Sequence, residues 1–158
     1  MIHWKTRNVQ WLNAESEPIS MDHIIESLKS KPGYEIHIGC DSHRIGGQYI
    51  FAIVIAGYVN RRGGTFFFHR KKSKDPQLDN MKIRLMKEVE LAIAVANQVR
   101  LNFPNKEISV HLDLNPKPEF PSYKVLPNAV SWVKSCGFNA LTKPHSWASS
   151  SLADSFAK

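Results

Sequence analysis

Two segments of this chain have the pattern of buried β-strands that end in an aspartate, and a long helical segment separates them. The first segment is 34–41, which ends at Asp41, and the second is 107–113, which ends at Asp113. A strand, a long helix and another strand favour a right-handed crossover, which makes the two strands parallel. Because ligands of open α/β sheets bind at the carboxyl ends of the strands, we expect the two carboxylates to lie side by side there.

The alternation of side chains along each strand predicts which residues share a face. Asp41 falls on the side of His37 and Gly39, and Asp113 falls on the side of Ser109 and His111. Two carboxylates so close are costly unless a cation lies between them, which favours a divalent metal. The alternative is turn chemistry, since Asp-Ser and Asn-Pro sequences after a strand are common in turns.

The remaining elements follow in the order β-β-β-α-β-α-β-α, with one small helix in front. Short glycine-bearing turns between the first three strands predict an antiparallel meander. After the meander, segments with a helical period alternate with two further strands. The expected segments are a helix from Ser20 to Lys29, strands 34–41, 48–59 and 65–71, a helix from Asp75-Pro76 or Asp79 to about Arg100, strand 107–113, a helix at 124–135, strand 138–142 and a last helix capped by Ser146. The predicted fold class is therefore α/β, a five-stranded mixed sheet of a three-stranded meander plus two parallel strands, flanked by helices. At 158 residues a single domain 1–158 is expected, in which 1–19 form an irregular arm.

Charge points to a polyanionic partner. The chain carries 21 Lys and Arg against 14 Asp and Glu, a net charge of +7. One stretch without acids holds the candidate nucleic-acid-binding residues Arg61, Arg62, Arg70, Lys71, Lys72 and Lys74. The alternative is a solvated hairpin whose lysines only maintain solubility. With no apolar run of membrane-spanning length and no secretory signal, a cytoplasmic protein without membrane association is expected.

Two further acids stand at positions that suit a site. Glu88 borders the helix stripe that faces the sheet, although Glu90, on another side of the same helix, competes for the role. Asp154 lies among small and apolar residues of the last helix. Four converging carboxylates would suit Mg²⁺ or Mn²⁺, because both prefer oxygen ligands. A pair of such ions can activate a water and stabilise a leaving oxygen in phosphoryl transfer.

The order of these motifs resembles a ribonuclease H-like domain, and more narrowly the YkuK-type ribonuclease H-like family. The resemblance covers roughly residues 15–158 and rests on five short segments: Ile38-Gly39-Cys40-Asp41-Ser42-His43, residues 84–89, residues 111–115, Lys143-Pro144 and Ala153-Asp154-Ser155. It implies that Asp41, Glu88, Asp113 and Asp154 bind the metals. It also implies that His145, which precedes the last acid, helps in protonation or product release, although a loop histidine can simply be solvated.

The resemblance implies a type of reaction but does not identify the substrate. The expected activity is a two-metal nuclease that hydrolyses RNA, an RNA/DNA hybrid or structured DNA, with Lys143 as a further phosphate contact or a merely solvated lysine. One departure is that no basic protrusion of the ribonuclease HI kind interrupts the chain. The alternatives are a nucleic-acid-binding domain with little turnover, and an interaction domain that keeps the acids without using them. The sequence leaves the oligomeric state open.

Overall fold

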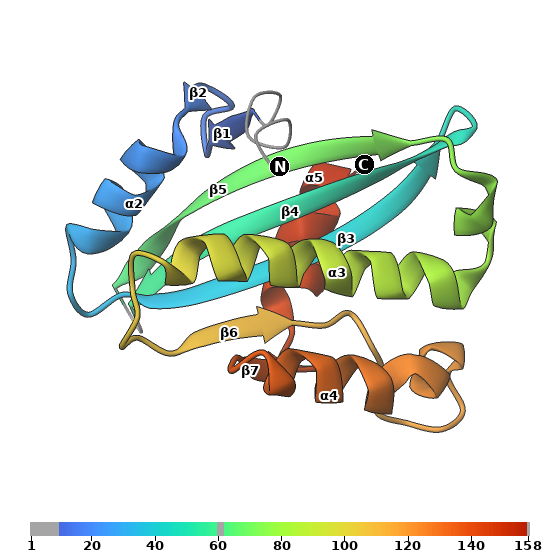
Figure 1. The fold of residues 1–158 in the computed structure, drawn as a ribbon. Helices are drawn as coiled ribbons and strands as arrows, with labels where there is room; N and C mark the ends of the chain where they lie inside the picture. Colours follow the sequence, from blue (N-terminus) through green and yellow to red (C-terminus); the bar gives the residue numbers. More distant parts are fainter. Residues whose placement is uncertain (1–9, 60–61, 158) are drawn as a thin grey trace.

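A seven-stranded mixed sheet forms the centre of the molecule (Figure 1). This computed structural model describes residues 10–59 and 62–157. The strands are β1 (Trp11–Asn13), β2 (Pro18–Ile19), β3 (Glu35–Ile45), β4 (Gln48–Val59), β5 (Gly63–Ser73), β6 (Ile108–His111) and β7 (Asn139–Leu141). Their order across the sheet is β2-β1-β5-β4-β3-β6-β7. The β3, β4 and β5 strands form the expected antiparallel meander, and β3, β6 and β7 run parallel.

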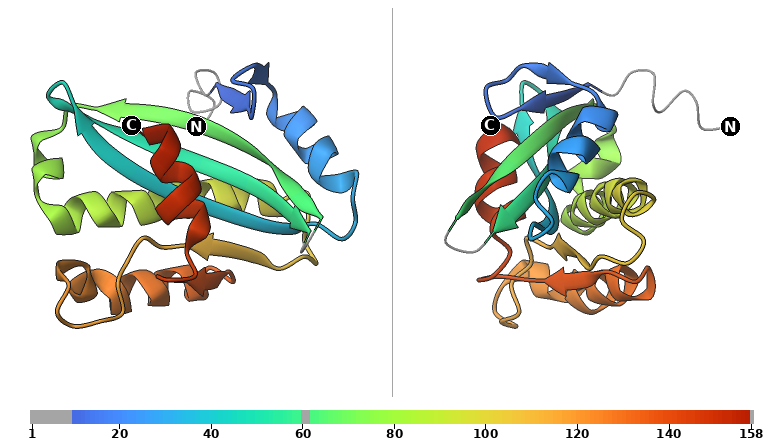
Figure 2. Two further views of the ribbon diagram at one scale, coloured as in Figure 1. Left: turned by 180° about the vertical axis from the view of Figure 1, so that it is seen from behind. Right: turned by 90° about the vertical axis from the view of Figure 1, so that its left-hand side faces the viewer.

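Helices cover both faces of this sheet (Figures 1 and 2). The helical elements are α2 (Met21–Lys29), η1 (Pro76–Asp79), α3 (Met81–Arg100), η2 (Pro121–Val125), α4 (Leu126–Ser135), η3 (Ala148–Ala153) and α5 (Asp154–Ala157). Helices α3 and α4 lie on one face, and η3 with α5 crosses the other face over β3 and β4 (Figure 2). Among the described residues, no helix has the length and apolarity that crossing a membrane requires.

Side-chain alternation along β3 divides its residues between two cores, as the sequence predicts. Ile36, Ile38 and Cys40 join the large core that also contains the buried residues of α2, α3 and α4. The opposite face packs a smaller apolar cluster against η3 and α5, which includes Val54 and Phe68. The expected α/β class is therefore confirmed.

The strand count is a correction, because the sheet has seven strands rather than five. Residues 10–19, which the sequence assigns to an irregular arm, contain β1 and β2. Strands of three and two residues are too short to show an alternating pattern, so their pairing has no periodic signal. β1 forms because it pairs with the outer edge of β5, and this pairing buries Trp11.

Element boundaries also differ from expectation at the end of β3 and in the last helix. β3 continues past Asp41 to Ile45, since its pairing with β4 extends to the turn at Gly46. Ser146 does not cap the last helix, because its hydroxyl pairs with Ser150 Oγ at 2.8 Å. The helix begins as a π-helical segment, η3, before α5. Asp75 caps the short turn η1, and α3 has its own N-cap at Asn80.

Candidate metal centre

Asp41 and Asp113 come together because β3 and β6 are parallel neighbours in the register that the sequence requires. The ladder pairs Gly39 with His111, so the residues two positions on, Asp41 and Asp113, follow at the same level. β6 ends at His111. Beyond the level of His111, β3 has no neighbour among the described strands on its β6 side. Side chains from both faces of the sheet can therefore meet there.

Glu88 reaches this edge from α3. Its side chain is buried, and its Oε2 accepts a hydrogen bond of 2.6 Å from Ser42 Oγ. Ser42 follows Asp41 and therefore faces α3 rather than α5. Glu90 points elsewhere, since it is exposed and pairs with Lys87 at 3.3 Å. Of the two competing glutamates, only Glu88 lies beside the aspartates.

Asp154 is brought in from the opposite face by the π-helical segment η3. This segment lies so close to β3 that a Cβ built on Gly39 would be 2.5 Å from the carbonyl carbon of Ala148. Only glycine permits that approach. As a result Asp154, the first residue of α5, stands with its carboxyl in hydrogen-bond contact with Asp41.

Two buried histidines fix the position of η3. The Ala148 amide donates to His111 Nδ1 at 3.0 Å, so this nitrogen is the acceptor of a neutral ring. His111 Nε2–H must then donate to His37 Nδ1, 2.8 Å away, and His37 Nε2 faces Glu35 at 3.1 Å. Burial lowers the pKa of His111 to about 3, as this tautomer requires. The histidines behind the aspartates are therefore buried, hydrogen-bonded core residues.

Lys143 and Ser150 are the partners of Asp113. Lys143 Nζ lies 3.0 Å from Asp113 Oδ1, and Ser150 Oγ donates to the same oxygen at 3.0 Å. The lysine therefore stands among the carboxylates as an internal counter-charge. His145, two residues later, is exposed, and within the described part of the chain its ring has no hydrogen-bond or ion-pair partner.

The shifted pKa values show that the carboxylates act on one another. Burial, a hydrogen bond with Asp154 and the charge of Asp113 together raise the pKa of Asp41 to about 8. Burial, followed by the charge of Asp41, raises the pKa of Glu88 well above its usual range. One lysine and two hydroxyls do not neutralise four carboxylates in so small a space. Their chemistry fits one or more divalent cations with oxygen ligands.

Most of the predicted basic residues do not form one patch. Arg61 lies outside the described residues, and Arg62 stands at the β4–β5 turn, at the opposite end of β5 from Lys71 and Lys72. Arg70 Nε donates to the Phe156 carbonyl at 2.6 Å and so holds the end of α5. Lys71, Lys72 and Lys74 are exposed at the other end of β5.

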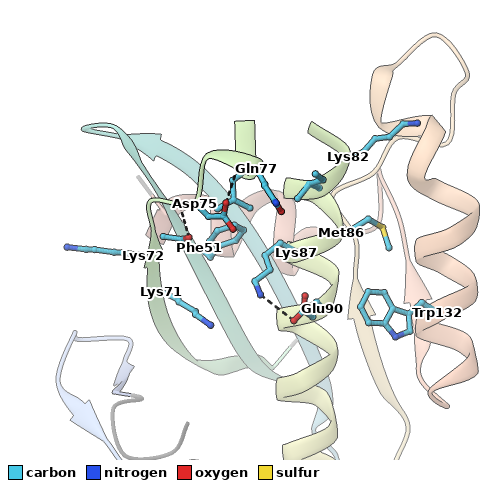
Figure 3. A pocket seen from close by; sticks show the side chains of 13 residues that line it. Phe51, Lys71, Lys72, Asp75, Gln77, Lys82, Met86, Lys87, Glu90 and Trp132 are labelled. Atoms are coloured by element: carbon cyan, nitrogen blue, oxygen red, sulfur yellow. Dashed lines mark hydrogen bonds and ion pairs between the residues drawn. The ribbon is translucent and has the colours of Figure 1, made fainter. Parts of the chain in front are cut away.

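A groove of about 620 Å³ adjoins the site on the α3 face (Figure 3). It runs from β5 across the outer face of α3 to Trp132 on α4. Its lysines are Lys71, Lys72, Lys82 and Lys87, and its acids are Asp75 and Glu90. Phe51, which lines the groove, pairs with Ser42 on the adjacent strand, so the groove begins about 5 Å from Ser42, one interstrand spacing away.

Sequence reasoning missed Ser42, His43 and Ser150 as members of the site. His43 Nε2 lies 2.6 Å from Asp154 Oδ1 and 3.5 Å from Asp41 Oδ2. A signal for it existed, because a strand that continues past Asp41 places His43 on the same face. No sequence pattern predicted the role of Ser150, because the direction of its side chain depends on the π-helical geometry of η3.

Comparison with known proteins identifies the class. A sequence model of the ribonuclease H-like family matches residues 20–158, nearly the whole chain, and the chain belongs to that family. The matched range contains every motif on which the resemblance to the YkuK-type members depends, and that recognition is confirmed. A search of curated proteins and a search of solved structures found no match.

Proposed function

We propose that this protein is a metal-dependent nuclease that hydrolyses phosphodiester bonds in RNA, an RNA/DNA hybrid or structured DNA. The observation that carries the proposal is the meeting of four carboxylates at the level where β6 ends beside β3, in a chain of the ribonuclease H-like family. Asp41, Glu88, Asp113 and Asp154 would hold two Mg²⁺ or Mn²⁺ ions. When bound, such ions supply an activated water and stabilise the leaving oxygen in phosphoryl transfer.

The protein's own residues prepare this centre. Ser42 fixes the Glu88 carboxylate through its short hydrogen bond, and Ser150 fixes Asp113 in the same way. Each bond holds a ligand oxygen in place, which lowers the cost of ordering the site when a metal arrives. His145, on the exposed loop before η3, is a candidate to carry a proton to or from the substrate. The position of Lys143 beside Asp113 would let its ammonium contact a substrate phosphate once metals neutralise the acids.

The groove on the α3 face is the proposed path of the nucleic acid. Lys71 at its β5 end, with Lys82 on α3, would contact phosphates, because exposed lysines gain affinity by releasing counterions; Lys72 points away from the groove (Figure 3). Trp132 at the other end offers an aromatic surface on which a base can stack. Lys82 and Trp132 lie outside the basic stretch of the sequence, but they line the same groove as Lys71, which lies near the acids.

A second candidate is a nucleic-acid-binding domain with little turnover. The ion pair of Lys143 with Asp113 favours it, since a lysine among the acids can replace a metal as their counter-charge. In this alternative the groove binds nucleic acid and the carboxylate cluster has a structural role only.

Cleavage assays separate the two functions. Labelled RNA/DNA hybrid, single-stranded RNA and branched DNA are incubated with the protein and Mg²⁺ or Mn²⁺, alongside Asp41→Asn, Asp113→Asn and the control Asp22→Asn. Asp22 is an exposed acid in the first turn of α2, away from the site. The nuclease proposal expects divalent-dependent cleavage of at least one substrate, lost in the first two variants and kept in the control. Tight binding without cleavage by the wild type would favour the second candidate.

A further inference from the structure

We propose that His43 is a nitrogen ligand of one metal ion in this centre and makes that position favour Mn²⁺ over Mg²⁺. The inference rests on the proposed function for the presence of a metal. It adds a residue that the four-carboxylate site does not contain, and with it a metal preference.

The first argument is the placement of the imidazole. His43 Nε2 lies between two acids from different elements, 2.6 Å from Asp154 Oδ1 and 3.5 Å from Asp41 Oδ2. One donor atom from each of the three residues lies within 4.8 Å of the others. Two ligands of a single ion stand at most about 4–5 Å apart, because each bond is about 2.0–2.6 Å long. The three donors therefore fit one ion without rearrangement of the backbone.

The second argument is how the strand divides the site. Asp41 and His43 are two residues apart on β3 and share the face that α5 covers, whereas Ser42 and Glu88 meet on the α3 face. Asp41 is coupled to both sides, through its hydrogen bond with Asp154 and through the charge of Glu88. Two metal positions that share Asp41 follow from this division. The position on the α5 face is the one with His43 and Asp154.

The chemistry of the donors then sets the preference. Mg²⁺ takes oxygen ligands almost exclusively and loses its waters reluctantly, whereas first-row transition metals accept imidazole nitrogen. A position with two carboxylates and one imidazole gives Mn²⁺ a ligand that Mg²⁺ uses poorly. Metal binding replaces any proton on Nε2, and that proton leaves to solvent. Without metal, the same Nε2–H can donate to Asp154, which accounts for the short contact.

The test measures metal binding and the ligand atoms directly. Mn²⁺ and Mg²⁺ affinities are measured by calorimetry for the full-length wild type, His43→Ala and His43→Gln. Gln keeps a hydrogen-bond donor but has no imidazole nitrogen to bind the metal. Pulsed electron paramagnetic resonance of the Mn²⁺ form reports nitrogen directly bound to the metal. His23→Ala is the matched control, because His23 is an exposed histidine on α2 whose ring hydrogen-bonds with Ser20.

The proposal expects a nitrogen coupling in the wild type and in His23→Ala that disappears in both His43 variants. It expects Mn²⁺ affinity to fall by at least about tenfold in those variants. Removing a residue that only hydrogen-bonds to a metal ligand already causes a loss of about this size. Mg²⁺ affinity should fall much less. A Mn²⁺ spectrum without nitrogen coupling, in a protein whose Mn²⁺ binding requires Asp41, overturns the role of His43 and leaves the carboxylate centre standing. If the wild type binds no Mn²⁺, or binds it independently of Asp41, the proposed function fails as well.

Discussion

Replacing Asp41 with asparagine is expected to stabilise the metal-free protein, and to do so only above about pH 4. Burial, a hydrogen bond with Asp154 and the charge of Asp113 raise the pKa of the Asp41 carboxyl to about 8. An exposed aspartate in the unfolded chain has a pKa of about 3.9. Between these values the unfolded chain has lost the proton and the folded protein still holds it, so the free energy of unfolding falls as pH rises. The contribution is absent below about pH 4 and complete above about pH 8.

The size of the effect follows from the same difference. About four pKa units, at about 1.4 kcal/mol each, give a ceiling of about 6 kcal/mol at pH 8. The repulsion is shared with Asp113, Asp154 and Glu88, which can keep part of the charge off Asp41 by staying protonated themselves. We therefore expect Asp41→Asn to gain about 2–4 kcal/mol at pH 8, which is roughly 5–15 °C in Tm for a chain of this size. At pH 4.5 the gain should be under about 1 kcal/mol.

Thermal and urea unfolding in EDTA at pH 4.5 and pH 8 measure this difference, with Asp22→Asn as the control for removing an exposed acid. Adding Mn²⁺ at about 1,000 Kd should cancel or reverse this difference at pH 8, because the wild type then gains about 4.1 kcal/mol and the variant does not. If Asp41→Asn is no more stable than the wild type at pH 8, or its gain is equal at both pH values, the carboxylates do not repel one another as described.

Three other changes test separate parts of the structure. Gly39→Ala should destabilise the protein by about 1–3 kcal/mol in urea unfolding, because its Cβ would meet the backbone of η3, whereas Gly33→Ala has open space around it and should change little. Lys143→Met should tighten Mn²⁺ binding by roughly twofold to fivefold in calorimetry, since the lysine no longer competes for Asp113; weaker binding would argue against competition. Lys71→Ala should lower the salt slope of nucleic-acid binding, log K against log salt, by about 0.7–0.9, and an unchanged slope would exclude it from phosphate contact.

The pairing of Asp41 with Asp113 could be predicted from sequence because it depends on local patterns. Two strand patterns that lead into an aspartate, joined through a long helix, predict a right-handed crossover, and alternation assigns the faces of their side chains. Glu88 follows from the same reasoning, since the 3.6-residue period places it at the border of the buried stripe of α3. These residues occupy positions that the regular geometry of strands and helices determines.

Other parts of the site depend on contacts that no local pattern encodes. The strands β1 and β2 form only because the edge of β5 is available, and the basic stretch is divided because β5 carries its ends to opposite sides of the molecule. The course of η3 depends on the hydrogen bond from Ala148 to His111 and on the absence of a side chain at Gly39. Ser150 and Asp154 acquire their partners only after that packing. Long-range contacts of this kind have to be seen in the structure.

The central claim is that the acids at the ends of β3 and β6 form a divalent-metal centre. Anomalous diffraction from crystals soaked in Mn²⁺ tests it most directly, since the signal locates manganese independently of any activity. We predict anomalous peaks within ligand distance of the Asp41 carboxylate, with Glu88, Asp113 and Asp154 around them. Crystals that take up Mn²⁺ only at other places, with these four carboxylates bare, would contradict the claim.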